Sequence, residues 1–164
     1  MARAWVFADD LDTDQIVPGR YAPFMVGQDK FHLYAFCDAR PGFAREAQPG
    51  DVLVGGENFG CGSSREYAVA ALKKLGIGGI VAKSFARIFF RNCINLGIPV
   101  LDSADAVSLA RDGDEVTLDL AAGLLRTPRG DARLRPLAPF AREILTAGGV
   151  VAYLREHGDF PEVT

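Results

Sequence analysis

The residues best suited to chemistry lie in one run, Asn58-Phe-Gly-Cys-Gly-Ser-Ser-Arg-Glu. An apolar segment precedes this run and a helical pattern follows it, so we expect it at a strand-to-helix junction, where α/β folds expose backbone N–H groups. Gly60 and Gly62 have no Cβ and would let the backbone approach a ligand closely. The hydroxyls of Ser63 and Ser64 and the planar guanidinium of Arg65 suit a carboxylate or a phosphate. The run therefore predicts an anion-binding site.

Two other interpretations of the same run stay open on spacing alone. Ser63 followed three residues later by Glu66 also fits a helix capping box, which needs no function. Gly60 and Gly62 are similar to part of a dinucleotide-binding loop, but Arg65 stands where such loops have their third glycine, and no acidic ribose partner is evident about 20 residues later. A non-catalytic module that binds an anion or a nucleotide is thus the main alternative to an enzyme.

The elements that would position the run alternate between strands and helices. Apolar segments predict strands at residues 3–7, 52–55, 77–82 and 98–101, and helical patterns predict helices at 65–75 and 85–96. Their order implies parallel strands joined by right-handed helical crossovers. Alternation at 115–120 predicts an antiparallel strand with a partner at 124–127, and residues 139–157 predict one or two helices. The expected fold class is α/β, with a mainly parallel central sheet, flanking helices and an added antiparallel hairpin.

Residues 21–48 show neither helical nor strand periodicity. Prolines, glycines and aromatic residues are mixed there without a fixed spacing. We expect a long loop that could contain a short helix. Long ordered loops are uncommon in compact domains and are often functional.

Length and charge narrow the class of protein. The chain has 164 residues and a net charge of −3. Domains typically span roughly 100–150 residues, so we expect a single domain over residues 1–164. A general nucleic-acid binder would need a basic face, and a membrane protein would need a longer apolar run than any present here. Acidic residues follow the first strand at once, unlike a signal peptide, so we expect a cytoplasmic protein.

The metal-ligating residues are few and scattered. The three cysteines, Cys37, Cys61 and Cys93, include no Cys-x-x-Cys pair, and His32 and His157 are the two histidines. This pattern argues against a disulfide framework, a metal site held by this chain alone and a Ser-His-Asp triad. We expect reduced thiols and no metal ligand in this chain.

Three motifs in order resemble the swivelling domain of the aconitase superfamily. Gly62-Ser-Ser-Arg-Glu-Tyr-Ala is similar to its Gly-Ser-Ser-Arg-Glu-His-Ala signature. Asp12-Thr-Asp-Gln-Ile-Val-Pro-Gly resembles its first loop, and Ala82-Lys-Ser-Phe-Ala-Arg-Ile-Phe-Phe-Arg-Asn-Cys-Ile-Asn-Leu-Gly-Ile-Pro resembles the segment after the signature. The length resembles that of the detached small subunits of the isopropylmalate dehydratase and homoaconitase types. The resemblance implies a swivelling β/β/α domain.

The resemblance also implies a division of labour between two chains. In this family a large subunit holds a [4Fe-4S] cluster on three cysteines, so this chain would carry no cofactor and would work in a heterodimer or heterotetramer. The implied activity is a hydro-lyase that moves a hydroxyl between adjacent carbons of a small carboxylic acid, in leucine or lysine biosynthesis. By motif position, Ser63 resembles the serine that, as an alkoxide, removes a proton, and Arg65 resembles the arginine that holds a substrate carboxylate. Gly62 and Ser64 would contribute to substrate binding.

The chain departs from the family pattern at two places, and the first bears on the substrate. Relatives commonly have a Tyr-Leu-Arg-like tripeptide after the first loop, whereas this chain has Tyr21-Ala-Pro-Phe-Met. Phe24, Met25 and Val26, together with Tyr21, would suit the isopropyl group of isopropylmalate, while Arg20 or Lys30 would suit the distal carboxylate of homoaconitate. The bland alternative is that these side chains only fill the core under a loop. The second departure is Tyr67 where His is frequent, which we expect to pack or to form a hydrogen bond.

Overall fold

A seven-stranded sheet runs through the computed structural model, which describes residues 2–159, in the order β4-β3-β2-β1-β5-β6-β7. Four parallel strands form one half: β1 (Ala2–Val6), β2 (Val52–Gly55), β3 (Gly79–Ala82) and β4 (Val100–Asp102). An antiparallel extension continues from β1: β5 (Glu115–Asp119), β6 (Leu124–Thr127) and β7 (Gly130–Arg133). The expected α/β fold class with a parallel central sheet is confirmed.

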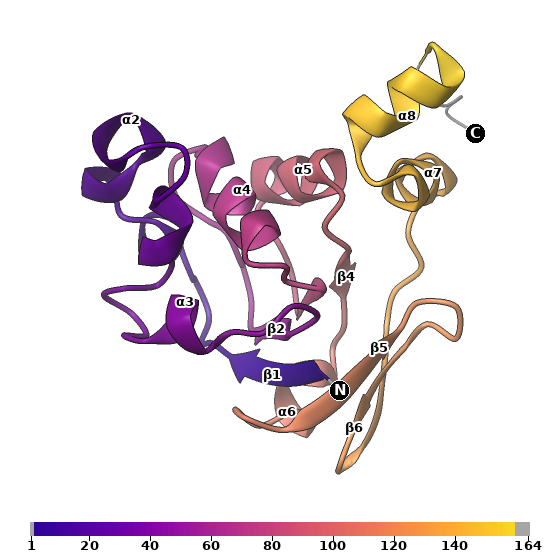
Figure 1. Ribbon diagram of the computed structural model, residues 1–164. Helices are drawn as coiled ribbons and strands as arrows, with labels where there is room; N and C mark the ends of the chain where they lie inside the picture. The colour runs from indigo at the N-terminus through magenta and orange to yellow at the C-terminus, as the bar shows by residue number, and fades with distance from the viewer. Residues whose placement is uncertain (1, 160–164) are drawn as a thin grey trace.

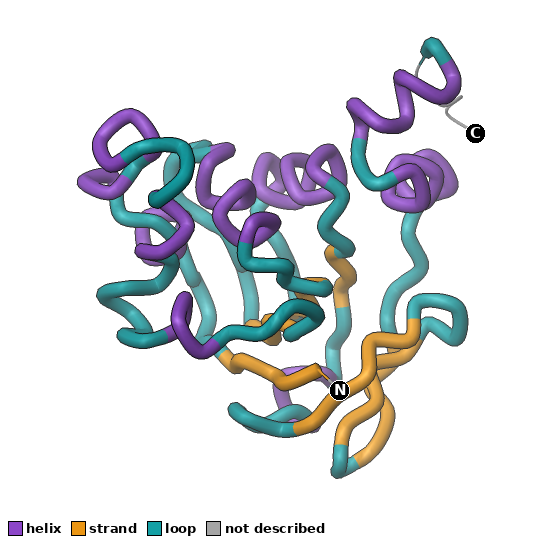
Figure 2. Tube along the Cα trace, in the orientation of Figure 1, coloured by secondary structure: helices purple, strands orange, loops and turns teal. Residues whose placement is uncertain are grey.

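The main helices lie on one side of the strands (Figure 1). They are the crossovers α4 (Glu66–Lys74) and α5 (Arg87–Leu96) and the C-terminal pair α7 (Pro139–Ala147) and α8 (Val150–His157). The short helix α6 (Ala106–Leu109) covers the other side. Figure 2 shows most of the helices above the strands, with the short helix α6 on the lower side. None of the helices in the described part of the chain has the length and apolar character of a membrane span.

Each parallel strand contributes to two hydrophobic cores because successive side chains point to opposite faces. Leu53, Ile80 and Val100 belong to the core under α4 and α5. Their neighbours belong to a second core on the opposite face of the sheet: Val52, Val54, Val81 and Leu101. Burying such a side chain contributes about 1.5–3 kcal/mol, so both faces stabilise the sheet.

The connection from β1 to β2 is a chain of short helices. It contains α1 (Thr13–Ile16), η1 (Gly19–Tyr21), α2 (Pro23–Val26), η2 (Phe31–Tyr34) and α3 (Phe43–Glu46). Phe31, Phe36 and Phe43 are at most 1% exposed, and Phe36 stacks on Phe7 with ring centroids 4.6 Å apart. The sequence predicted a long loop here. The sequence did not reveal the short helices, because the buried aromatic side chains that pack them against the first core have no regular spacing.

The antiparallel extension is larger than the expected hairpin. β7 was not predicted, because Gly130-Asp-Ala-Arg has one apolar side chain, the buried Ala132, in four residues. After β7 the chain passes the outer edge of β4, where the backbone N–H of Arg135 donates to the carbonyl of Asp102 at 2.8 Å. The two ends of the curled sheet therefore meet around the second core.

Candidate active site

The loops that follow β1, β2 and β3 meet at the carboxyl edge of the parallel sheet. The backbone N–H of Gly60 donates to the carbonyl of Leu11 at 2.7 Å, and that of Phe59 donates to the carbonyl of Ser84 at 3.0 Å. Asp12 and Cys61 form an isolated parallel bridge. The motif loop, residues 56–65, is therefore held between its two neighbours by backbone hydrogen bonds.

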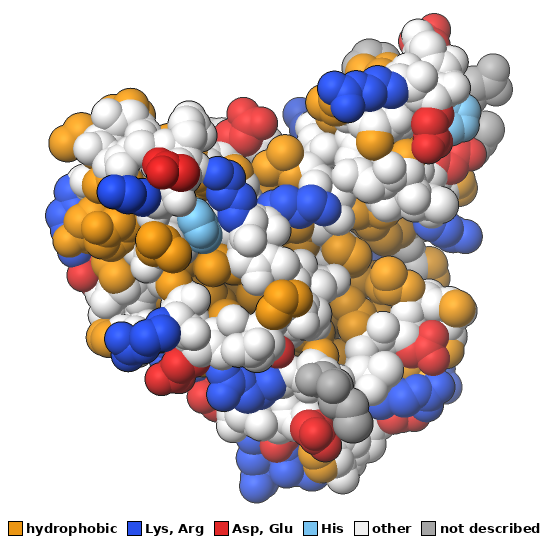
Figure 3. Space-filling view, viewed as in Figure 1, with side chains coloured by type: hydrophobic (Ala, Val, Ile, Leu, Met, Phe, Trp, Pro, Cys, Tyr) orange, Lys and Arg blue, Asp and Glu red, His pale blue; other side chains and the backbone are white. Residues whose placement is uncertain are grey.

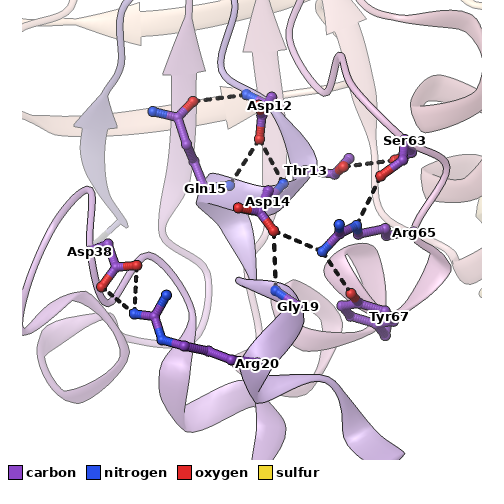
Figure 4. Close-up of polar contacts among 10 residues, drawn as sticks. All are labelled: Asp12, Thr13, Asp14, Gln15, Gly19, Arg20, Asp38, Ser63, Arg65 and Tyr67. Carbon is purple, nitrogen blue, oxygen red and sulfur yellow. Dashed lines mark hydrogen bonds and ion pairs between the residues drawn. The ribbon is translucent and has the colours of Figure 1, made fainter.

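Ser63 and Arg65 are brought into direct contact at the end of the motif loop. Nε of Arg65 donates to Oγ of Ser63 at 2.9 Å (Figure 4). The hydroxyl of Thr13 donates to the carbonyl of Ser63 at 2.7 Å, which ties this residue to α1. Ser63 and Ser64 are exposed, and the side chain of Arg65 is 26% exposed. A hydroxyl thus lies at the surface with a cationic donor beside it.

Three further residues fix the position of the Arg65 guanidinium. Its Nη1 donates to Oδ1 of Asp14 at 2.8 Å and to the hydroxyl of Tyr67 at 3.0 Å. The same Asp14 oxygen accepts the backbone N–H of Gly19 at 3.1 Å. A Cβ added to Gly19 would lie 3.0 Å from Nη1 of Arg65, so this glycine leaves room for the guanidinium.

Asp14 is in turn placed by a capping box at the start of α1. The side chain of Asp12 accepts the backbone N–H groups of Asp14 and Gln15, and the Gln15 side chain accepts the backbone N–H of Asp12. Sequence reasoning missed Asp14 and Gly19. The Asp-Thr-Asp turn marked the segment, but no spacing in the sequence indicates that it meets a guanidinium 51 residues away.

Two interpretations of the motif loop are corrected by this geometry. α4 begins at Glu66 with Arg65 as its N-cap residue, without a side-chain cap hydrogen bond, so Ser63 does not cap the helix. Gly60 has φ +83°, and a Cβ there would lie 2.1 Å from Cγ of Phe89. Gly60 is therefore required by its backbone conformation and by packing, not by the approach of a ligand.

A cleft of about 400 Å³ opens beside Ser63. One wall holds Gly62, Ser63, Ser64 and Arg65, and the opposite wall is the first turns of α5. The start of a helix presents backbone N–H groups with partial positive charge, which favours an anion. Arg87, Ile88, Phe89 and Asn92, which the sequence did not mark as site residues, line this wall of the cleft.

The segment expected to read the substrate is exposed. Phe24 is 83% and Met25 61% exposed, whereas Val26 is partly buried. Tyr21 stacks on Tyr34 with ring centroids 4.1 Å apart. The interpretation that Phe24 and Met25 fill the core is therefore wrong. These two side chains form an exposed apolar surface on α2.

The residues of this site do not fit a metal cluster. Among residues 2–159, no group of three or more histidine, cysteine or acidic side chains is placed to hold a metal ion. Burial raises the pKa of the thiols of Cys37, Cys61 and Cys93, which disfavours the thiolate that binds iron. The hydroxyls, the guanidinium and the helix start suit a carboxylate instead.

Comparisons with known proteins agree with this chemistry. Residues 13–105 match the family described as Aconitase C-terminal domain. The chain is 56% identical to the homoaconitase small subunit of Thermus thermophilus, over 98% of this chain and 99% of that protein. It is 55% identical to 3-isopropylmalate dehydratase small subunit 1 of Deinococcus radiodurans, over 98% and 90% of the two chains. A crystal structure of 3-isopropylmalate dehydratase from Methanocaldococcus jannaschii matches with a TM-score of 0.88 and 39% identity, over 96% of this chain and 93% of that one.

Proposed function

The chain belongs to the aconitase C-terminal domain family, and from that premise we propose that it is the small subunit of a two-subunit hydro-lyase. The enzyme isomerises a 2-alkylmalate-type acid by dehydration and rehydration, and 3-isopropylmalate is the first candidate substrate. Relatives at 55% and 56% identity, matched almost end to end, are named small subunits, which supports the assignment. The free thiols of Cys37, Cys61 and Cys93 are consistent with a reducing cytoplasm.

The contact between Ser63 and Arg65 carries the proposal. A serine hydroxyl is a weak base, and its alkoxide needs a nearby positive charge. Nε of Arg65, 2.9 Å from the Ser63 oxygen, supplies that charge. Ser63 then removes a proton from one substrate carbon while the hydroxyl leaves the neighbouring carbon, and water returns with the two positions exchanged.

Arg65 has donors left for the substrate. Nε and Nη1 are engaged by Ser63, Asp14 and Tyr67, while Nη2 has no hydrogen-bond partner among residues 2–159. Nε and Nη2 form the same edge of the guanidinium, so a carboxylate bound to Nη2 would lie next to the Ser63 hydroxyl. Arg65 therefore both favours the alkoxide and places the carbon that loses its proton.

The iron-sulfur cluster belongs to the large subunit in this proposal. When bound there, its open iron supplies Lewis-acid activation of the substrate hydroxyl. The cleft beside Ser63 faces that partner and holds the other end of the substrate. Gly62 and Ser64, in the wall of the cleft, and the start of α5 contribute polar groups for a second carboxylate.

The surface of α2 favours isopropylmalate. Phe24 and Met25 present apolar atoms to solvent, and Arg20, one of the two candidates for a distal carboxylate, is already paired with Asp38 at 2.6 Å. Homoaconitate is the second candidate, because the 56% identical relative from Thermus thermophilus is named a homoaconitase subunit.

A reconstitution assay tests the function. The chain is mixed anaerobically with the cluster-loaded large subunit of the same organism, and kcat/KM is measured for isopropylmalate and homoaconitate. We expect turnover of one of these acids with both subunits present and none with either alone. Absence of turnover with the assembled pair on both substrates would overturn the proposal.

A further inference from the structure

A second hollow of about 790 Å³ lies between α5 and α7, and we call it the α5–α7 groove. One wall is a single face of α5, with residues spaced by three and four positions as on one side of a helix. These residues are Arg87, Phe90, Arg91, Ile94 and Asn95. The other wall is Phe140, Ala141 and Ile144 of α7 with the preceding linker, residues 135–138.

The groove has an apolar floor and an exposed rim. Ile94, Ala141 and Ile144 are 4–5% exposed, whereas Phe140 is 38% exposed. The space-filling view shows the C-terminal helices as a lobe that stands apart from the body, with apolar side chains at its base (Figure 3). A Cβ added to Gly97 would lie 2.4 Å from the carbonyl oxygen of Gly148, so α7 is held close to the far end of α5. The α5–α7 groove is therefore closed at this end by backbone packing.

The rim carries positive charge that is only partly compensated within the groove. The side chains of Arg87 and Arg91 make no ion pair or hydrogen bond within residues 2–159. Arg135 approaches Asp102 at 3.9 Å, and its side chain is 79% exposed. The whole chain has a net charge of −3, so these guanidinium groups form a local positive region on an acidic protein. A ligand of this rim must be acidic.

The groove is continuous with the cleft beside Ser63. Arg87 lines both hollows, because it stands at the first turn of α5 between them. In the proposed function the partner's iron must face Ser63. A partner seated over that cleft extends across Arg87 into the groove.

We infer that the α5–α7 groove is the docking site of the large subunit, which inserts an amphipathic helix with acidic residues beside its apolar face. The inference rests on the proposed function for the identity of the partner. Two helical walls with an apolar floor fit a third helix, as in other helix-in-groove complexes. The arginine rim meets the acidic side chains, and Phe90 and Phe140 cover the apolar face.

The test measures association separately from turnover. Affinity for the cluster-loaded large subunit of the same organism is determined by anaerobic titration calorimetry for the wild-type chain, Arg91→Glu, Phe140→Ala and Arg45→Glu. Arg91→Glu should raise Kd at least about tenfold, because it reverses a charge at the rim. Phe140→Ala should also weaken binding. Arg45→Glu is the matched control on α3, which precedes the amino end of β2, and should bind like wild type.

The outcomes separate this inference from the proposed function. Arg91 does not line the Ser63 cleft, so at saturating large subunit Arg91→Glu should recover wild-type kcat. Ser63→Ala should show the reverse pattern, with normal Kd and lost kcat. A wild-type Kd for both groove variants in an active enzyme would overturn the docking site and leave the function standing. Dimerisation of the isolated chain that Arg91→Glu abolishes would also overturn it, because a second copy would then occupy the groove.

Discussion

At the scale of single residues, the candidate chemistry depends on one guanidinium with several neighbours. Nε of Arg65 contacts Ser63, whereas Nη1 contacts both Asp14 and Tyr67. The carboxylate of Asp14 and the hydroxyl of Tyr67 restrict the rotation of the guanidinium. The edge formed by Nε and Nη2 therefore faces Ser63 and the cleft.

Ser63→Ala should reduce kcat of the reconstituted enzyme by a factor of about 10²–10⁴, the usual contribution of a general base. The fold should change little, because Ser63 does not cap α4. Thermal unfolding and kcat are measured on the same preparation. Ser108→Ala, which removes an exposed hydroxyl of α6, is the control and should leave kcat unchanged. Near-normal turnover of Ser63→Ala would remove the base role.

Arg65→Lys should raise KM and lower kcat together although the charge is retained. An ammonium cannot reach Ser63, Asp14 and a carboxylate at once, because its donors do not lie in a planar fork. Steady-state kinetics with the large subunit present measure both constants. The guanidinium is not needed if the two constants equal those of wild type.

At the scale of elements, the loops after β1 and β2 together form the candidate site at the carboxyl edge of the parallel sheet. The capping box of α1 fixes Asp14, and the motif loop fixes Ser63, so the Ser63-Arg65-Asp14 arrangement requires both. α2 follows α1 closely in the chain and holds Phe24 and Met25 outward. In the proposed function, the positioning of Arg65 by α1 and the choice of substrate by α2 thus depend on adjacent parts of one connection.

Gly60→Ala should destabilise the protein more than Gly113→Ala. Both glycines have positive φ, +83° and +88°, which strains any other residue by about 1–2 kcal/mol. A Cβ at Gly60 also meets Phe89, whereas nothing lies within 4 Å of one at Gly113. Overpacking adds about 1–3 kcal/mol. Urea unfolding of both variants measures the difference, and equal losses would mean that Phe89 moves without cost.

Phe24→Arg should lower kcat/KM for isopropylmalate and raise the ratio of kcat/KM for homoaconitate to kcat/KM for isopropylmalate. An arginine there would leave a charge against the isopropyl group but would pair with a distal carboxylate. The control Leu33→Arg changes another exposed apolar residue, 57% exposed on η2, and should leave the ratio unchanged. An unaltered ratio in Phe24→Arg would exclude α2 from substrate choice.

The sequence predicted the elements whose periodicity is strong and missed those held by tertiary contacts. The four parallel strands and the helices α4 and α5 were predicted within a few residues, because the strands are short apolar runs and the helices have apolar side chains at helix spacing. β7 has too few apolar residues to show alternation, and the single turns between β1 and β2 depend on buried aromatic rings. Ser63 and Arg65 were proposed from the motif, and the structure brings their side chains into contact. Asp14 was not, because only the folded chain brings it to Arg65.

At the scale of the whole molecule, the proposed function gives the described chain half of a site. Ser63 and Arg65 are exposed or partly exposed at the edge of a cleft, and polar groups in such a position retain water until a partner excludes it. The large subunit would close the cleft and bring the iron that this chain does not fit.

The chain purified alone should contain no stoichiometric iron and should show no visible absorbance after anaerobic incubation with iron and sulfide. Cys93 is buried in α5, and within residues 2–159 neither Cys37 nor Cys61 is gathered with other ligands into a metal site. Iron analysis by mass spectrometry provides the measurement. Stoichiometric iron that survives gel filtration would contradict the division of labour.

The linker after β7 covers part of the outer edge of β4. An exposed edge strand offers free N–H and C=O groups to other chains and can start edge-to-edge polymerisation. Here the carbonyl of Asp102 on β4 is taken by Arg135, and β7, the opposite edge, is four residues long and carries Asp131 and Arg133. The described part of the chain therefore leaves little free sheet edge, and we expect edge-to-edge polymerisation of the isolated chain to be slow.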